Sequence, residues 1–148
     1  MNQDNTGRRA SNEVSDTPPK ARILVVDDDK FLLDMYGQKF SGAGFVVETS
    51  LSGADALQIL RGGFSPDIVI FDITMPELDG FAFLKSITDE HLAPGAIKIA
   101  LTNQSDEAEK SKAAELGVSR YIVKASMIPS EVVAAVTEAL AKRRPAKH

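Results

Sequence analysis

The residues best suited to chemistry are acidic groups and a lysine that each follow a short apolar run. The acidic run Asp27–Asp29 comes directly after Ile-Leu-Val-Val, and Asp72 comes directly after Ile-Val-Ile-Phe. Two further apolar runs end in Thr102 and in Lys124. Apolar, β-branched runs of this length are typical of strands buried on both faces of a parallel sheet. If these strand ends meet at one edge, the polar groups converge there.

Carboxylates gathered in one small volume need a cation beside them. Asp27, Asp28 and Asp72 are the three expected to converge, and two like charges ~4 Å apart repel by about 4 kcal/mol at an effective dielectric constant of about 20. Mg²⁺, which takes one or two carboxylates plus water, would offset this repulsion, and Lys124 would neutralise one further charge. An aspartate in such a site can attack phosphorus and form an aspartyl phosphate, with the metal, the ammonium and a threonine hydroxyl stabilising the phosphoryl oxygens.

Several other kinds of site are excluded. A dinucleotide-binding domain needs a glycine-rich turn after its first strand, whereas this chain has Asp27–Asp29 there, whose charges would repel a phosphate. The chain also lacks the GxxxxGK[ST] loop of phosphate-binding domains. It contains no cysteine, which excludes disulfides, thiolate metal sites and cysteine nucleophiles.

The elements that must position these residues alternate between strands and helices. The expected strands are Ile23–Val26, Phe45–Val47 (the weakest), Asp67–Phe71, Ile97–Leu101 and Tyr121–Val123. The expected helices are Asp29–Ser41, Ala54–Arg61, Asp79–Glu90, Asp106–Leu116 (weakly amphipathic) and Ser130–Arg144. This order predicts an α/β fold with a doubly wound five-stranded parallel sheet, (βα)₅, and helices on both faces. In such sheets the site lies at the carboxyl ends of the strands, beside the point where the strand order reverses.

Composition fits one globular domain. The chain has 148 residues, of which 43% are hydrophobic, enough to build a core. We expect a disordered tail over 1–20, a folded domain over 21–142 and a basic tail over 143–148. The net charge of −4 combines an acidic body with that basic end, and an acidic body argues against nucleic-acid binding, which needs a basic face.

No segment approaches the roughly 20 apolar residues of a membrane span, and the first 20 residues lack the apolar stretch of a secretory signal. A cytoplasmic protein without membrane association is expected. No second apolar core follows Leu140, so we expect any output to act through a partner.

Four motifs in this order resemble the receiver domain of two-component response regulators. They are Ile23–Asp29, Pro66–Gly80, Ala100–Thr102 and Tyr121–Lys124, and the resemblance covers roughly residues 21–142. It implies a flavodoxin-like receiver fold that accepts a phosphoryl group from a sensor histidine kinase or a phosphotransfer protein. Such a protein is a phosphoacceptor rather than an enzyme, although it assists its own phosphorylation and dephosphorylation. The last two helices and the fifth strand would carry the signal to an output protein.

The resemblance assigns a role to each acidic residue. Asp72 would be the phosphoacceptor. Asp28 and Asp72 would bind Mg²⁺ directly, with the backbone carbonyl of Thr74 as a further ligand. Asp27 would act through a metal-bound water.

Three other residues would respond to the phosphoryl group. Thr102 would bond it through its hydroxyl, Lys124 would pair with it, and Tyr121 would be the switch aromatic that rotates inward when Thr102 moves. The family usually has a cis proline after the lysine, whereas this chain has Ala125. Because a cis bond before a non-proline residue costs about 3 kcal/mol or more, we expect a trans Lys124–Ala125 peptide and a rebuilt loop.

Plainer interpretations stand beside these. Asp27–Asp29 could be helix-start charges, Thr102 a capping hydroxyl, Lys124 a solvated lysine and Tyr121 a core tyrosine with an exposed hydroxyl. The alternative function is a receiver-fold interaction module that works without phosphorylation. A small aspartyl-phosphate hydrolase of another fold would need a second acid two residues after the nucleophile, where this chain has Thr74.

Overall fold

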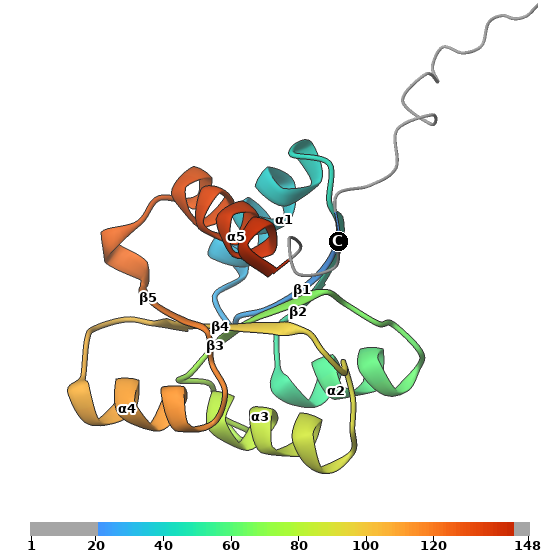
Figure 1. The fold of residues 1–148 in the computed structure, drawn as a ribbon, viewed down its shortest axis with the longest axis vertical. Coiled ribbons are helices and arrows are strands. Elements are labelled where there is room, and N and C mark those ends of the chain that lie inside the picture. The colour runs from blue at the N-terminus through green and yellow to red at the C-terminus, as the bar shows by residue number, and fades with distance from the viewer. Residues whose placement is uncertain (1–20, 144–148) are drawn as a thin grey trace, which may run out of the picture.

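The computed structural model describes residues 21–143, in which five strands alternate with five α-helices (Figure 1). The strands are β1 (Arg22–Val26), β2 (Val46–Ser50), β3 (Ile68–Asp72), β4 (Ile97–Thr102) and β5 (Arg120–Val123). The helices are α1 (Lys30–Gly42), α2 (Gly53–Arg61), α3 (Gly80–Asp89), α4 (Glu107–Glu115) and α5 (Pro129–Arg143), with a 3₁₀ turn η2 (Lys124–Ser126) before α5. The α/β class expected from the sequence is confirmed.

The strands form one parallel sheet in the order β2-β1-β3-β4-β5. The chain steps from β1 outward to β2 and then returns to the other side of β1, so the strand order reverses between β1 and β3. Helices α1 and α5 cover one face of the sheet, and α2, α3 and α4 cover the other (Figure 1). The doubly wound topology is therefore as predicted, and the strands whose ends carry Asp27 and Asp72 are neighbours.

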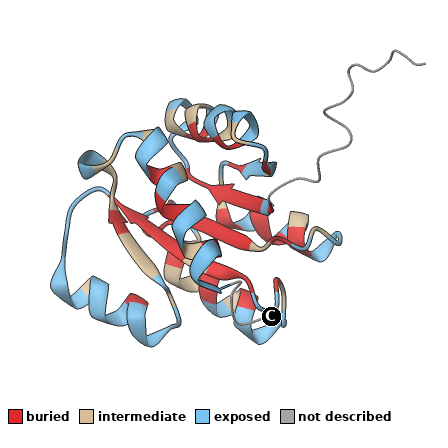
Figure 2. Ribbon diagram, turned by 45° about the horizontal axis from the view of Figure 1, so that its top comes forward, coloured by how far each residue is buried: buried red, intermediate tan, exposed pale blue. Residues whose placement is uncertain are grey.

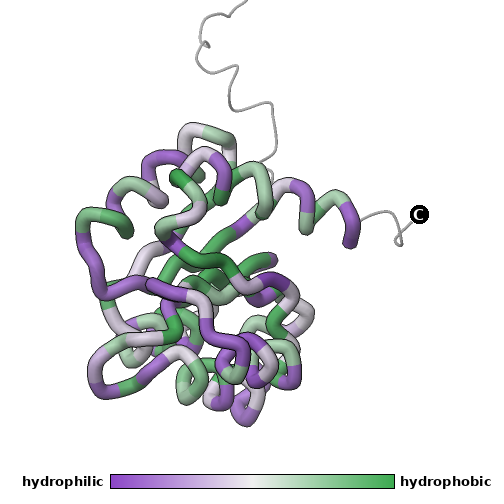
Figure 3. The backbone as a smooth tube through the Cα atoms, turned by 90° about the vertical axis from the view of Figure 1, so that its left-hand side faces the viewer, coloured by the Kyte–Doolittle hydropathy of each residue, from purple (hydrophilic) through white to green (hydrophobic). Residues whose placement is uncertain are grey.

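The core forms two layers because successive strand residues point to opposite faces. In β1, Ile23 and Val25 pack toward α1 and α5, while Leu24 and Val26 pack toward α2 and α3. All of β3 is buried, as a central strand covered on both faces should be. Figure 2 shows the buried strands between exposed helix surfaces, and Figure 3 shows the same strands as the hydrophobic centre of the molecule.

Three helices begin one residue later than the sequence predicted. Asp29, Asp79 and Asp106 are N-caps with extended backbones, and each carboxylate accepts a hydrogen bond from the N–H three residues on. Capping is the usual role of an aspartate at a helix start. The second strand was also misplaced: it runs over Val46–Ser50 rather than Phe45–Val47. As an edge strand with mostly exposed or half-buried residues, β2 tolerates polar side chains that hide its pattern.

Helix α4 is the least buried helix of the domain. Ala113 is its one buried residue, as its sequence pattern led us to expect. Within residues 21–143, no helix combines the length and apolar content needed to cross a membrane. The tail expected over 1–20 lies outside the described residues. Of the basic tail expected over 143–148, Arg143 is the last residue of α5, and the rest also lies outside the described part.

Candidate functional site

Three carboxylates converge at the carboxyl ends of β1 and β3, as predicted. Asp27, Asp28 and Asp72 each offer an oxygen within 4.8 Å of the others. Asp27 and Asp72 are buried, whereas Asp28 is exposed. The site therefore has a buried floor with one carboxylate open to solvent.

Local turns fix the orientation of the two buried carboxylates. Oδ1 of Asp27 accepts a hydrogen bond of 2.9 Å from the N–H of Asp29, and Oδ1 of Asp72 accepts one of 3.0 Å from the N–H of Thr74. The Oδ2 atoms of both aspartates face the ammonium of Lys124, at 2.8 Å from Asp27 and 2.9 Å from Asp72. One lysine at the end of β5 thus joins the ends of β1 and β3.

The electrostatics of the site leave negative charge unbalanced. Burial raises the pKa of Asp72 to about 6, against the opposing hydrogen bond and charge of Lys124. Burial alone would lower the pKa of Lys124, but its bonds and charge interactions with Asp27 and Asp72 outweigh this and raise it. Three carboxylates against one ammonium leave a formal surplus of two negative charges.

The residues fit a hard divalent cation. The cluster offers oxygen donors only, and its surplus negative charge matches a divalent ion. The Thr74 carbonyl, the other predicted ligand, accepts no backbone hydrogen bond among the described residues. Mg²⁺ is therefore compatible with this donor set.

The loop after Asp72 is held close to β3 by a glycine. The N–H of Gly80 donates to the Ile73 carbonyl at 2.8 Å. A Cβ at Gly80 would lie 2.7 Å from the Asp72 carbonyl oxygen and 2.7 Å from Cα of Ile73. No other residue type fits this approach without a shift of the backbone beside Asp72.

Thr102 and Tyr121 meet on a residue that sequence reasoning did not single out. Oε1 of Glu109 accepts hydrogen bonds from the Tyr121 hydroxyl at 2.6 Å and from the Thr102 hydroxyl at 3.1 Å. The Thr102 hydroxyl also lies 3.1 Å from the carbonyl oxygen of Gln104. Thr102 is buried at the end of β4, but no hydrogen bond joins it to Asp72 among the described residues.

A second residue absent from our sequence-based site is Tyr36 of α1, which is 2% exposed. Burial raises the pKa of its hydroxyl, with a further rise from the charge of Asp27. The predicted trans bond after Lys124 is confirmed, because residues 21–143 contain no cis peptide, and the chain continues directly into η2.

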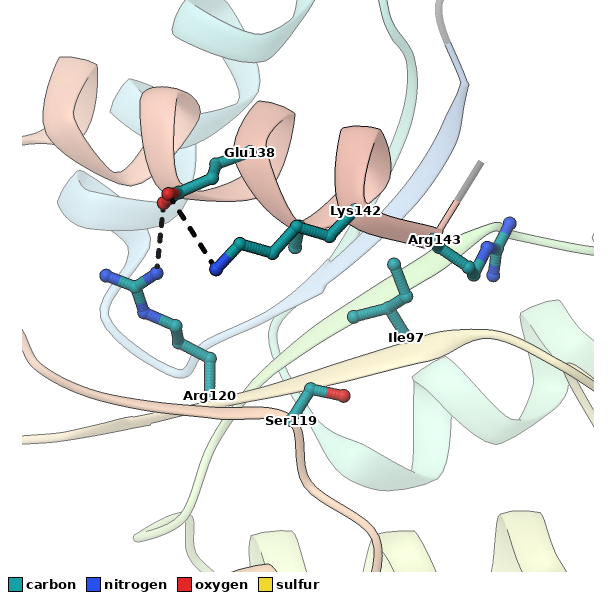
Figure 4. Close-up of a pocket in the computed structure, with 7 residues that line it drawn as sticks. Ile97, Ser119, Arg120, Glu138, Lys142 and Arg143 are labelled. Atoms are coloured by element: carbon teal, nitrogen blue, oxygen red, sulfur yellow. Dashed lines mark ion pairs between the residues drawn. The ribbon is translucent and has the colours of Figure 1, made fainter. Parts of the chain in front are cut away.

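A separate concave surface lies between β5 and the end of α5, away from the acidic cluster (Figure 4). Glu138 pairs there with Arg120 at 3.5 Å and with Lys142 at 3.9 Å. Arg143 donates to the Gly95 carbonyl and lies 3.6 Å from Asp67. These cations already have partners, so the groove does not compete with the acidic cluster as the candidate site.

A (βα)₅ sheet with an acidic cluster and a lysine beside the reversal of strand order defines the class of flavodoxin-like receiver folds. Residues 23–137 match the response regulator receiver domain, and the chain belongs to this family.

Known proteins agree with this assignment. The chain is 32% identical over 131 residues to a probable transcriptional regulator, ycf27, of Guillardia theta, covering 88% of this chain and 50% of that protein. It is 33% identical over 126 residues to the response regulator SaeR of Staphylococcus epidermidis, covering 85% and 53%. The chain thus spans about half the length of the curated relatives it matches. A CheY-like receiver domain protein from Methanospirillum hungatei has a TM-score of 0.74 at 26% identity, covering 85% of this chain and 96% of that one.

Proposed function

We propose that this protein is a phosphoacceptor whose receiver domain, residues 21–142, takes a phosphoryl group onto Asp72 in a Mg²⁺-dependent reaction. The observation that carries the proposal is the pair of contacts from Lys124 to the buried carboxylates of Asp27 and Asp72. This ammonium lies where a phosphoryl group on Asp72 would bring new negative charge.

Asp72 is the nucleophile: a carboxylate oxygen bonds to phosphorus while the bond from phosphorus to the donor breaks and its electrons leave with the donor. Asp28, Asp72 and the Thr74 carbonyl would hold Mg²⁺, and Asp27 would hold one of its waters. The ion supplies positive charge that draws phosphoryl oxygens to the site. Lys124 would exchange its ion pair with the Asp72 carboxylate for one with the phosphoryl group. Thr102 would donate a hydrogen bond to the phosphoryl group, and Tyr121 would rotate inward as Thr102 moves.

The donor in this proposal is a sensor histidine kinase or a phosphotransfer protein. The output surface comprises α4, β5 and α5. Tyr121 supports this choice, because it is half-buried in β5 and bonded to α4, so a change at Thr102 reaches both elements through it.

Incubation with acetyl phosphate and Mg²⁺, followed by intact-protein mass spectrometry, tests the proposal. The wild type should gain the mass of one phosphoryl group, and Asp72→Asn should gain none. Asp29→Asn is the matched control, because it removes one nearby carboxylate while asparagine remains a good N-cap.

A phosphoryl group retained by Asp72→Asn would overturn the assignment of the acceptor. If the wild type binds no Mg²⁺ in calorimetry and gains no mass, the alternative of an interaction module that works without phosphorylation is favoured instead.

A further inference from the structure

Glu109 occupies a central position between the two residues assigned to the switch. Its Oε1 atom is the acceptor for both the Thr102 and the Tyr121 hydroxyl, which come from β4 and β5, while Glu109 itself lies in α4. A carboxylate oxygen has two lone pairs and can accept both bonds. A single carboxylate oxygen of α4 is therefore hydrogen-bonded to side-chain hydroxyls from both β4 and β5.

The Thr102 hydroxyl can donate one hydrogen bond, and two acceptors lie within reach of it. Oε1 of Glu109 and the carbonyl oxygen of Gln104 both lie 3.1 Å away. Hydrogen bonds to an ionised carboxylate are roughly twice as strong as neutral ones, so Glu109 is the stronger of the two acceptors. A phosphoryl oxygen on Asp72 would be a third acceptor, also ionised, for the same proton.

Helix α4 depends on such polar contacts because it buries so little. Ala113 is its one buried residue, and Lys112 lies over the ring of Phe81 in α3 at 4.7 Å. The two hydrogen bonds of Glu109 are the side-chain bonds that tie the described helix to β4 and β5. Loss of either bond removes one of the few contacts that hold α4 against the sheet.

We propose that Glu109 is a positioning residue that competes with the phosphoryl group for the Thr102 hydroxyl, so that phosphorylation releases α4. The proposal rests on the proposed function. In the unphosphorylated protein Glu109 holds Thr102 and Tyr121 together. When Thr102 turns its proton to a phosphoryl oxygen, Glu109 keeps only Tyr121, and α4 loses one of its two bonds to the sheet.

The first test compares phosphorylation rates with limiting acetyl phosphate and Mg²⁺. Glu109→Ala should be phosphorylated about three- to tenfold faster than wild type, because the Thr102 hydroxyl then keeps only the weaker Gln104 carbonyl as its acceptor; tenfold corresponds to about 1.4 kcal/mol. Glu109→Gln, which keeps a neutral acceptor, should fall between the two. Glu115→Gln is the matched control, since it removes an exposed carboxylate from the same helix and should leave the rate unchanged.

Repeating the Glu109→Ala substitution in a protein that lacks the Thr102 hydroxyl shows whether Glu109 acts through that hydroxyl or only through the stability of the fold. Thr102→Ala should be slower than wild type, and adding Glu109→Ala to it should give no further gain. A rate gain of equal size in the Thr102→Ala background would overturn the competition.

Amide hydrogen exchange over residues 107–116 provides a readout without turnover. In the wild type, beryllofluoride with Mg²⁺, an analogue of the phosphoryl group, should speed exchange in α4. Glu109→Ala, which lacks both bonds, should exchange at least that fast before the analogue is added. If Glu109→Ala exchanges like the wild type in both states, Glu109 does not anchor α4.

The two proposals fail in different ways. If the wild type gains a phosphoryl group on Asp72 but the Glu109 variants react at the wild-type rate, the proposed function stands and the role of Glu109 is wrong. If the wild type gains none, the proposed function fails and the competition fails with it.

Discussion

The ammonium of Lys124 lies 2.9 Å from Oδ2 of Asp72, although β4 lies between β3, which ends in Asp72, and β5, which Lys124 directly follows. The lysine reaches past the end of β4 and also lies 2.8 Å from Asp27 at the end of β1. Its side chain is 9% exposed, so the pair is shielded from water on most sides. This ion-pair bridge joins the edge strand to the two central strands.

Lys124→Met should destabilise the metal-free protein by about 3 kcal/mol, because it leaves two buried carboxylates without their cation. Urea unfolding at pH 7 with EDTA measures this. Adding Asp72→Asn to Lys124→Met should recover part of the loss. Lys85→Met is the control, since the pair of Lys85 with Asp89 is exposed and should contribute little. Equal losses in the two lysine variants would contradict the prediction.

The raised pKa of Asp72 predicts a pH dependence of stability. The folded state holds the Asp72 proton up to about pH 6, whereas an unfolded aspartate releases it near pH 4. Between these values the folded state binds more protons, so the free energy of unfolding falls as pH rises, by about 3 kcal/mol from this group. The loss is complete by about pH 7, one unit above the folded pKa.

Urea unfolding of wild type and Asp72→Asn at pH 4 to 7, both in EDTA, measures the difference in stability. The free energy of unfolding of the wild type minus that of the variant should fall across this interval and then level off. The other carboxylates contribute equally to both proteins, so their titration cancels in this difference. A difference that is constant with pH would show that burial does not raise the pKa of Asp72.

Magnesium should stabilise the folded protein through the acidic cluster. At pH 7, an ion concentration about 100 times the dissociation constant adds about 2.7 kcal/mol to the free energy of unfolding. Asp28→Asn should lose most of this gain yet keep the metal-free stability, since Asp28 makes no hydrogen bond or ion pair within the described residues. Asp29→Asn should keep the gain. Thermal unfolding with Mg²⁺ or EDTA measures all three proteins.

Gly80→Ala should destabilise the domain by about 2 kcal/mol or more, because its Cβ would press against the backbone of Asp72 and Ile73. It should also slow phosphorylation by acetyl phosphate, as the loop beside the acceptor shifts. Gly42→Ala, with no heavy atom within 4 Å of the new Cβ, should leave stability unchanged or raise it. Each variant adds one methyl group to the wild-type protein. Similar unfolding curves for the two variants would therefore refute the steric argument.

Much of this architecture could be predicted from the chain because the central strands carry a strong signal. In β1 and β3 nearly every residue is apolar, since both faces are covered, and the acidic residues stand at their ends. Parallel strands bring those ends to one edge, so the convergence of Asp27, Asp28 and Asp72 follows from the fold class. Lys124 could be placed by the same reasoning.

The role of Glu109 and the bounds of β2 could not be predicted, because both depend on tertiary contacts at partly exposed positions. Helix α4 contains Glu107, Glu109 and Glu115 within nine residues, and its sequence gives no apolar stripe that would orient it. Only the packed structure shows which of the three faces Thr102 and Tyr121. The edge strand β2 was misplaced for a related reason, because its exposure permits polar residues.

The contact between Lys124 and Asp72 joins residues 52 positions apart in the chain. It cannot form until β5 has joined the edge of the sheet, where its strand partner is β4. Contacts of such long sequence separation are made late in folding, after the entropy of closing the intervening loop has been overcome. An ion or phosphoryl group held by this site should therefore slow the unfolding of the domain and leave its folding rate almost unchanged.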